Sequence, residues 1–218
     1  MEIGGPHDGR VCIVVDVLRA SSTIVTMLER GCRRVVAAAH IDEARELKQR
    51  LPGHLLCGEA GGLPPEDFDH GNSPAEFSRL DLAGESAILA TTNGTKALAE
   101  VADTAASVLV GCLLNLTAVV GAAVRLADEL GATVTIAPAG DAGSSEEDFA
   151  VARAMVALAE GAPLEDVVHE VRNSRHAETL HRLALSEDVD FCAQQDVSVV
   201  VPILRTADDG LLSLVRLR

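Results

Sequence analysis

The sequence predicts an α/β fold with three layers, α/β/α, in which helices cover both faces of a mostly parallel central sheet. Two observations carry this prediction. Several short runs rich in Val, Ile and Ala have the nearly continuous apolar character of strands buried on both faces, and helical patterns separate these runs. Five strands are expected at residues 11–17, 34–38, 86–90, 107–110 and 133–137, and a weaker sixth at 54–57.

Apolar residues between these strands recur at helical spacing. The clearest helix runs from Leu116 to Leu130, where Gly131 supplies a C-terminal cap. Shorter patterns precede Gly31 and follow Leu98. After the fifth run, Ser145 to Asp148 has the sequence of a capping box and predicts a helix through Glu160. Further elements are expected as helices at 164–172 and 175–185, a strand at 197–203 and an edge strand at 211–217.

The order strand, helix, strand, helix, strand occurs twice, over residues 11–59 and 86–141, before a mainly helical part, 145–218. A structural duplication and a chance similarity of two alternating α/β units both explain this pattern. The connection at 60–81 contains three prolines and five acidic residues, so we expect little regular structure there. Because no low-complexity linker divides the chain, we expect a single domain over residues 1–218.

Composition narrows the classes of partner. The 218 residues include 18 Lys and Arg against 33 Asp and Glu, a formal net charge of −15, which disfavours binding to nucleic acid or anionic lipid. No apolar stretch approaches the roughly 20 residues of a membrane-spanning helix, and residues 1–10 do not resemble a signal peptide. Five widely spaced cysteines are typical of reduced core residues. We therefore expect a cytoplasmic protein, and a homodimer if the last strand pairs with a second copy.

Polar side chains follow the predicted strands, where an open parallel sheet binds its ligands. Asp16 and Glu59 each end an apolar run, and a buried carboxylate is costly unless it is paired or metal-bound. Together they form a plausible Mg²⁺ site, since Mg²⁺ commonly takes one or two carboxylates, waters and phosphate oxygens. The alternative for Asp16 is an ion pair with Arg19 or a helix cap. The full set expected at this edge is Asp16, Arg19, Glu59, Thr91, Asn93, Asn115 and Asp141.

Two hydroxyl-rich turns open helices after predicted strands. One contains Ser21, Ser22 and Thr23, and the other contains Asn93, Gly94 and Thr95, followed by Lys96. Free N–H groups at a helix N-terminus, beside small hydroxylated residues, favour an anion. The alternative is that these residues are ordinary N-caps. Two such turns with Arg19 and Lys96 nearby favour anion binding.

Several familiar sites are excluded. There is no phosphate-binding Gly-rich loop ending in Lys-Ser or Lys-Thr, and no Gly-x-Ser-x-Gly elbow. Leu18 stands where a phosphoaspartate hydrolase has the second acid of Asp-x-Asp. His70 is the histidine we expect near a site, whereas His176 is expected on a helix face. The run from Glu146 to Asp148 is most simply a helix-start charge pattern.

Taken together, these motifs resemble the 2-phosphosulfolactate phosphatase family over almost the whole chain, from about Val11 to Pro202. The matching residues are Val14 to Thr23, Gly58-Glu59, Phe68 to Pro74, Thr91 to Thr95, Asn115, Ala139-Gly140, Glu147 to Phe149, Ser174, Leu180, Asp188-Val189, Cys192 and Val201-Pro202. The resemblance implies a Mg²⁺-dependent phosphatase that converts (2R)-2-phospho-3-sulfolactate to 3-sulfolactate and phosphate, on a route to coenzyme M.

A substrate with phosphate, carboxylate and sulfonate groups needs local positive charge. We expect Asp16 and Glu59 to hold Mg²⁺, and Arg19 with the Ser21 to Thr23 turn to clamp the phosphate. Asn93, Gly94 and Thr95 would hold a second anionic arm, and Asn72 and Ser73 would close over it. Lys96 and Arg175 are the further cations expected nearby.

Two other functions stay open: a phosphatase for another small phosphorylated hydroxy acid, and a catalytically silent anion-binding module. Asp16 could attack phosphorus or hold the metal, and we favour the metal-holding role.

Overall fold

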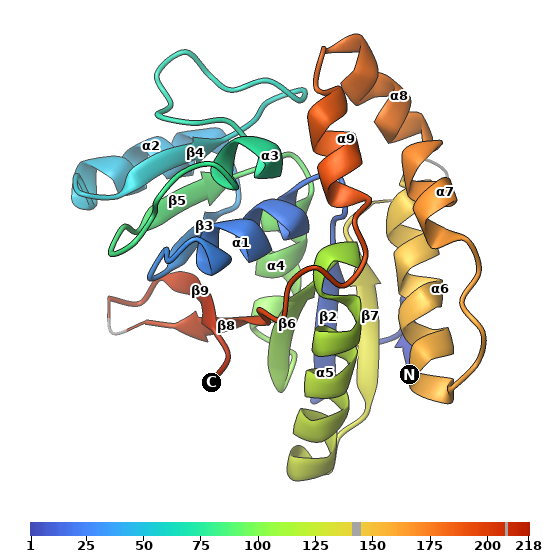
Figure 1. Ribbon diagram of the computed structural model, residues 1–218. Helices are drawn as coiled ribbons and strands as arrows, with labels where there is room; N and C mark the ends of the chain where they lie inside the picture. The colour runs from blue at the N-terminus through green and yellow to red at the C-terminus, as the bar shows by residue number, and fades with distance from the viewer. Residues whose placement is uncertain (141–144, 208) are drawn as a thin grey trace.

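Parallel strands make up most of the central sheet. The structure, a computed structural model, describes residues 1–140, 145–207 and 209–218, and within them nine strands form one sheet (Figure 1). All six strands expected from apolar runs are present, and the two-residue β1 is too short to carry a pattern. The strands are β1 (Glu2–Ile3), β2 (Val11–Val15), β3 (Val35–Ala38), β4 (Leu55–Gly58), β5 (Ala87–Ala90), β6 (Ser107–Gly111), β7 (Val134–Pro138), β8 (Pro202–Thr206) and β9 (Leu212–Arg216).

Helices lie on both faces of the sheet, which confirms the three-layer α/β/α prediction. One face packs against α1 (Ala20–Glu29) and α4 (Gly94–Ala102). The other packs against α2 (Ile41–Arg50), α5 (Leu116–Leu130) and α6 (Glu146–Glu160). The shorter helices are α3 (Pro74–Phe77), α7 (Val167–Arg172), α8 (Arg175–Arg182) and α9 (Ser186–Cys192), with a 3₁₀ turn, η1, at Leu113–Asn115.

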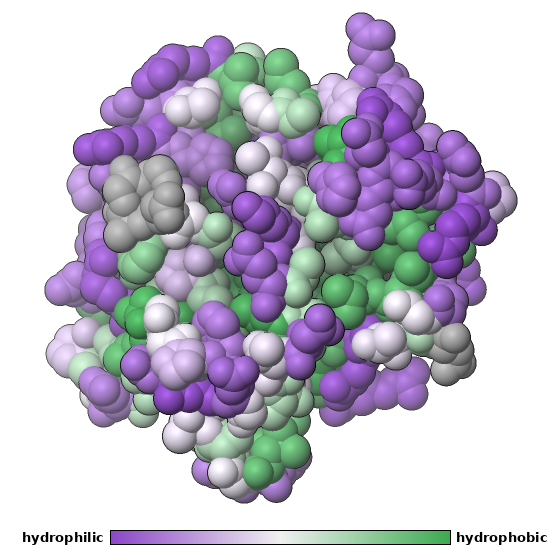
Figure 2. All heavy atoms as spheres, turned by 180° about the vertical axis from the view of Figure 1, so that it is seen from behind, coloured by the Kyte–Doolittle hydropathy of each residue, from purple (hydrophilic) through white to green (hydrophobic). Residues whose placement is uncertain are grey.

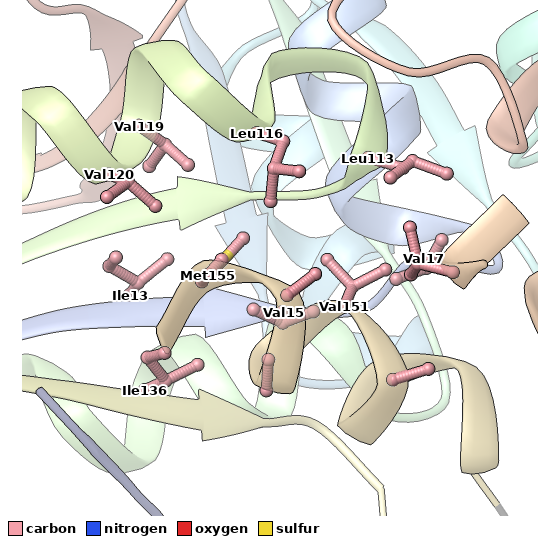
Figure 3. Close-up of a cluster of buried hydrophobic side chains, with 14 of the residues drawn as sticks. Ile13, Val15, Val17, Leu113, Leu116, Val119, Val120, Ile136, Val151 and Met155 are labelled. Atoms are coloured by element: carbon pink, nitrogen blue, oxygen red, sulfur yellow. The ribbon is translucent and has the colours of Figure 1, made fainter. Parts of the chain in front are cut away.

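Alternation along β2 divides its side chains between the two cores. Ile13 and Val15 pack with α5 and α6, while Cys12 and Val14 pack with the α1 and α4 side, as the period of two along a strand requires. All five residues of β2 are buried, which is why its sequence is continuously apolar. Figure 3 shows the first of these cores, where Met155 of α6 lies among the side chains of β2, β7 and α5.

The two predicted halves interleave their strands. The order across the sheet is β1-β7-β2-β6-β8-β9-β3-β5-β4, so β2 of the first half lies between β6 and β7 of the second. In the same way, β5 of the second half lies between β3 and β4 of the first. Each half therefore depends on the other for the partners of its first strand.

The β8–β9 hairpin joins these two parallel groups and sets their relative direction. Three successive antiparallel pairings, β6 with β8, β8 with β9 and β9 with β3, reverse the strand direction. Sheet twist of about 20–25° per neighbour adds up to roughly 100–125° over the five steps from β2 to β5, so the two strands are inclined at about 55–80° instead of opposed. Figure 1 shows β7 pointing to the top of the view and β5 pointing across it. The carboxyl ends of both groups can thus meet.

The C-terminal strands differ from the predictions. The strand expected at 211–217 is present as β9, but it lies between β8 and β3, so the expected edge position is wrong and the argument it gave for a homodimer is lost. The strand expected at 197–203 begins only at Pro202. Before it, the N–H groups of Asp196 and Ser198 donate to the carbonyls of Leu113 and Leu114 in η1, so this segment is tied to a turn and not to the sheet.

Three helical details also differ. The connection at 60–81 contains α3, which Ser73 caps by accepting a hydrogen bond from the Glu76 N–H. The helix expected at 175–185 ends at Arg182, Ala184 follows with φ of 60°, and a new helix, α9, begins at Ser186. In the described part of the chain, Ser145 makes no side-chain cap bond, so the capping box at the start of α6 is wrong.

The surface is mixed in character. From behind, hydrophilic residues cover much of the molecule and hydrophobic ones form smaller groups between them (Figure 2). Within the described residues, no helix combines the length and the apolar character needed to cross a membrane. The five cysteines are free and buried, and burial raises the thiol pKa of Cys12 to about 12 and that of Cys32 to about 11.

Asn115 connects η1 to the segment before β8. Its side chain is fully buried, accepts the Cys112 N–H at 3.0 Å and donates to the Val200 carbonyl at 2.8 Å. Asn115→Ala leaves both backbone groups without a partner, and we expect a loss of about 2–3 kcal/mol in the free energy of unfolding, measured by urea denaturation. The exposed Asn173→Ala is the matched control, with an expected change below about 0.5 kcal/mol. Equal midpoints for the two variants would contradict this role of Asn115.

Candidate active site

A pocket of about 230 Å³ opens where the carboxyl ends of β2, β4 and β5 meet. The loop after β4 forms one wall, and α8 with the residue that follows it forms another. This is the edge at which the sequence predicts ligand binding. The lining residues are Asp16, Leu18, Arg19, Glu59, Gly61, Gly62, Asn72, Thr92, Asn93, His176, Thr179, Leu180 and Leu183.

Asp16 follows β2 and is 7% exposed. Its Oδ1 accepts the N–H of Ala20 in the first turn of α1 at 3.1 Å, so the helix N-terminus partly neutralises the carboxylate. Burial raises the Asp16 pKa to about 6, although the Ala20 N–H opposes the shift. A cation in the pocket would stabilise the charged form of this buried carboxyl group.

Glu59 follows β4 and is 8% exposed. Oε1 accepts the Thr92 N–H at 2.7 Å and Oε2 accepts the Gly62 N–H at 2.7 Å. The carboxylate therefore joins the loop after β4 to the turn after β5. It also faces the same pocket as Asp16, as the Mg²⁺ hypothesis requires.

Two glycines allow the carboxylates to approach. A Cβ at Gly94 would stand 2.6 Å from Oδ2 of Asp16 and 2.5 Å from Cβ of Ala20. Gly58 has φ of +149°, and a Cβ there would collide with the Ala90 carbonyl oxygen. That oxygen accepts the Glu59 N–H at 3.0 Å. A side chain at either position would displace the neighbouring acid.

Arg19 comes next along the turn and follows a cis peptide bond with Leu18. Its guanidinium is held on two sides: Nη1 donates to Oδ2 of Asp188 at 2.7 Å, and Nη2 donates to the Gly62 carbonyl at 2.7 Å. Both members of the Arg19–Asp188 pair have side chains at most 3% exposed. Among the described lining residues, Arg19 is the only Lys or Arg.

Asn72 lines the pocket, and its side-chain oxygen has no hydrogen-bond partner among the described residues. The residue is 3% exposed. A buried acceptor left in this way costs about 1–3 kcal/mol. A cation or a donor group of a ligand would satisfy it.

A further acidic group lies at the start of α6. Glu147 is 1% exposed, and its Oε1 is 3.1 Å from Nδ1 of His176, while Oε2 has no hydrogen-bond partner among the described residues. The hydrogen bond to Glu147 raises the His176 pKa. Asp148 accepts the Val17 N–H at 2.7 Å, and burial raises the Asp148 pKa well above its ordinary value. The side chain at the fourth capping-box position thus turns away from Ser145 to support the turn after β2.

The structure brings together five predicted site residues and keeps others out of the pocket. Asp16, Arg19, Glu59, Asn72 and Asn93 line it.

Two hydroxyls of the first turn bind the backbone instead. Ser21 accepts the Asp16 N–H and Ser22 donates to the Val17 carbonyl. Thr23 is fully buried, and its hydroxyl makes no hydrogen bond to any described residue.

The remaining predicted residues lie beside or beyond the pocket wall. Ser73 donates to Asp188 at 2.6 Å, and Thr95 closes the turn with Thr91. Lys96 is exposed, and Nε of Arg175 is 3.4 Å from Oε1 of Glu146. Asn115 has the packing role described above, and Asp141 lies outside the described residues. The two expected additional cations therefore do not line the pocket.

Sequence reasoning missed His176, Glu147, Asp148 and Asp188 as site residues. The acidic run at 146–148 looked like a helix-start pattern, and His176 belongs to a helix that nothing in its own sequence places over the sheet. His70, the histidine singled out instead, is 2.6 Å from Glu76 and stacks near Phe77, away from the pocket. The available signal was that Glu147, Asp148 and Asp188 occur among the family-like motifs.

The pocket suits a hard cation with few protein ligands. Within residues 1–140, 145–207 and 209–218, no cluster of three or more His, Cys, Asp or Glu side chains is arranged to hold a metal. Two carboxylates are nevertheless a common Mg²⁺ donor set, since water and substrate phosphate complete the coordination. A zinc-type site is not favoured in the described part of the chain.

Asp148 supplies a test of the pocket's electrostatics. Because the pKa of Asp148 is raised in the folded state, the folded protein holds the carboxyl proton more tightly than the unfolded chain does. The free energy of unfolding therefore falls as the pH rises above the pKa that Asp148 has in the unfolded chain. Asp148→Asn keeps an acceptor for the Val17 N–H and removes the charge. In EDTA we expect its Tm to exceed that of the wild type by at least about 2 °C at pH 8, and the gain to vanish by pH 4. A lower Tm than the wild type at pH 8 would contradict this.

The comparisons with known proteins agree over nearly the whole chain. The family model for 2-phosphosulpholactate phosphatase matches residues 4–207. A probable 2-phosphosulfolactate phosphatase of Deinococcus radiodurans is 37% identical over 218 residues, which cover 93% of this chain and 91% of the relative. The 2-phosphosulfolactate phosphatase of Methanothermobacter thermautotrophicus is 37% identical over 223 residues, covering 96% and 92%. A probable member from Thermotoga petrophila is 36% identical, covering 91% of each chain. Because the family model matches residues 4–207 and these relatives are 36–37% identical, the chain belongs to the 2-phosphosulfolactate phosphatase family of hydrolases.

Proposed function

We propose that this chain hydrolyses the phosphate ester of 2-phosphosulfolactate with the help of Mg²⁺. The observation that carries the proposal is the shared pocket. Two carboxylates, one guanidinium and one buried unpartnered amide oxygen line it together, in a chain whose relatives are named for this reaction. We also propose a cytoplasmic location, since all five cysteines are free.

Asp16 and Glu59 would hold the Mg²⁺ ion. Both can coordinate a metal through oxygen, and both are buried at the pocket wall. Burial raises the Asp16 pKa, so a cation in the pocket would stabilise the charged carboxylate. Oδ1 of Asn72 is a further oxygen acceptor in the same pocket without a protein partner in the described residues. When bound, Mg²⁺ supplies Lewis-acid stabilisation of phosphate oxygens and lowers the pKa of a bound water.

The protein's own groups orient the ester. The Arg19 guanidinium donates two of its five N–H groups to Asp188 and Gly62, and its other N–H groups can bind the phosphate. In the described structure Asn93 makes no side-chain cap bond, so its amide can reach a second anionic arm. His176 adds positive charge when Nδ1 and Nε2 are both protonated, a form that Glu147 stabilises.

One observation favours a second candidate function. Phosphosulfolactate carries three anionic groups, yet Arg19 is the only Lys or Arg among the described lining residues. A small phosphorylated hydroxy acid without a sulfonate would need less compensation. A silent anion-binding module is the third possibility, and it predicts binding without phosphate release.

One assay tests both the reaction and the substrate. We expect phosphate release from phosphosulfolactate to exceed that from phospholactate, phosphoglycolate and an aryl phosphate, measured as kcat/KM with Mg²⁺. EDTA should abolish release and Mg²⁺ should restore it. Faster turnover of phospholactate would transfer the function to the second candidate. Stabilisation by these ligands without any release would identify the silent module.

Substitution tests the charges of Asp16 and Glu59, the two acids that would hold the metal. Asp16→Asn and Glu59→Gln keep the size of each side chain but remove its charge, so we expect kcat/KM to fall by about 10²-fold or more. Asp128→Asn, an exposed acid of α5, is the matched control and should retain wild-type kinetics. Activity of Asp16→Asn within threefold of the wild type would contradict a role for Asp16. A trapped acyl phosphate on Asp16 would replace metal holding with nucleophilic attack.

A further inference from the structure

Asp188 binds two parts of the pocket wall that are far apart in the sequence. It belongs to α9 in the C-terminal part of the chain and is 1% exposed. Oδ2 accepts Nη1 of Arg19 at 2.7 Å, while Oδ1 accepts the Ser73 hydroxyl at 2.6 Å and the Ala75 N–H at 3.2 Å. One carboxylate thus receives three donors from two separate segments.

The first contact fixes the direction of the Arg19 guanidinium. A guanidinium is planar, so bonds from Nη1 to Asp188 and from Nη2 to the Gly62 carbonyl determine both its position and its plane. Without the Asp188 bond, Arg19 would retain one anchor and could rotate about it. Its remaining donors would then no longer be aimed at one place.

The second set of contacts fixes the turn that carries Asn72. Ser73 is the N-cap of α3, and Ala75 lies in the first turn of that helix. Both are held by Oδ1 of Asp188, and Asn72 is the next residue back along the chain. The unpartnered Oδ1 of Asn72 therefore owes its place in the pocket to the carboxylate that also orients Arg19.

We propose that Asp188 is a positioning residue that aligns the Arg19 guanidinium for binding the anionic group of the substrate and fixes the turn that carries Asn72, whose Oδ1 can accept a cation or a donor group of the ligand. The identity of that substrate rests on the function proposed above, but the alignment does not. Asp188 does not line the pocket, so it acts through these two residues and does not touch the ligand.

Asp188→Asn isolates the contact with Arg19. The Asn oxygen can still accept the Ser73 hydroxyl and the Ala75 N–H, whereas its NH₂ group faces a guanidinium that has only donors. Ser73→Ala removes the bond to Asp188 together with the cap bond from the Glu76 N–H, and it leaves the Arg19 pair intact. Glu187→Gln is the matched control, because Glu187 is the preceding residue of α9 and pairs with Arg79 at the surface, where its side chain is 72% exposed.

The experiment combines kinetics with binding of inorganic phosphate by calorimetry, with Mg²⁺ present. We expect Asp188→Asn to weaken phosphate affinity and to lower kcat/KM by about tenfold each, mainly through KM, and Ser73→Ala to do so by about threefold. Glu187→Gln should match the wild type. In a double-mutant cycle, adding Asp188→Asn to Arg19→Ala should cost less than about twofold further.

The outcomes separate this inference from the proposed function. If the wild type hydrolyses an ester and Asp188→Asn loses only Tm, with KM and phosphate affinity unchanged, Asp188 is merely structural and the inference is wrong. If the wild type hydrolyses no ester in the panel, the proposed function fails, and the phosphate affinities alone decide the inference. The inference is also wrong if the wild type binds no phosphate.

Discussion

Burying several carboxylates in and beside one small pocket is the constraint on which the rest of this site depends. Asp16, Glu59, Glu147 and Asp148 are each at most 8% exposed, and buried charge is costly without compensation. The chain compensates mainly with backbone N–H groups, from Ala20 to Asp16, from Thr92 and Gly62 to Glu59, and from Val17 to Asp148. Among the described acids and amides of the site, Oε2 of Glu147 and Oδ1 of Asn72 have no hydrogen-bond partner, and both are acceptors that a cation or a hydrogen-bond donor would satisfy.

The pocket requires the turns after three strands to meet. Asp16 follows β2, Glu59 follows β4 and Thr92 follows β5, yet β2 and the β4–β5 pair belong to different parallel groups of the sheet. The antiparallel hairpin between the groups, together with sheet twist, brings their carboxyl ends to one place. Gly58 and Gly94 then permit backbone and carboxylate to approach closely where the turns touch. The site is therefore a product of topology as much as of its side chains.

Sequence patterns predicted the elements that carry their own periodicity. The six apolar strands, α5 and α6 are confirmed, because burial on both faces or on one stripe leaves a local mark. The place of β9 in the middle of the sheet could not be predicted, since pairing depends on strands distant in the chain. Asp16 and Glu59 could be predicted at this edge because they directly follow strands, and Arg19 because it lies in the turn after β2. His176 and Asp188 reach the site only through the packing of short helices. The hydroxyls of Ser21 and Ser22 bind the backbone, which the sequence could not distinguish from ligand binding because a cap and a ligand site share the same residue types.

The central position of β8 and β9 has a consequence for biosynthesis. Among the described strands these two are synthesised last, yet they form the seam between the two parallel groups. Until they emerge from the ribosome, β6 and β3 present open edges, and the nascent chain can hold only two unjoined sheets. The pocket, which takes residues from both groups, can then be assembled only after residues 202–216 have been synthesised.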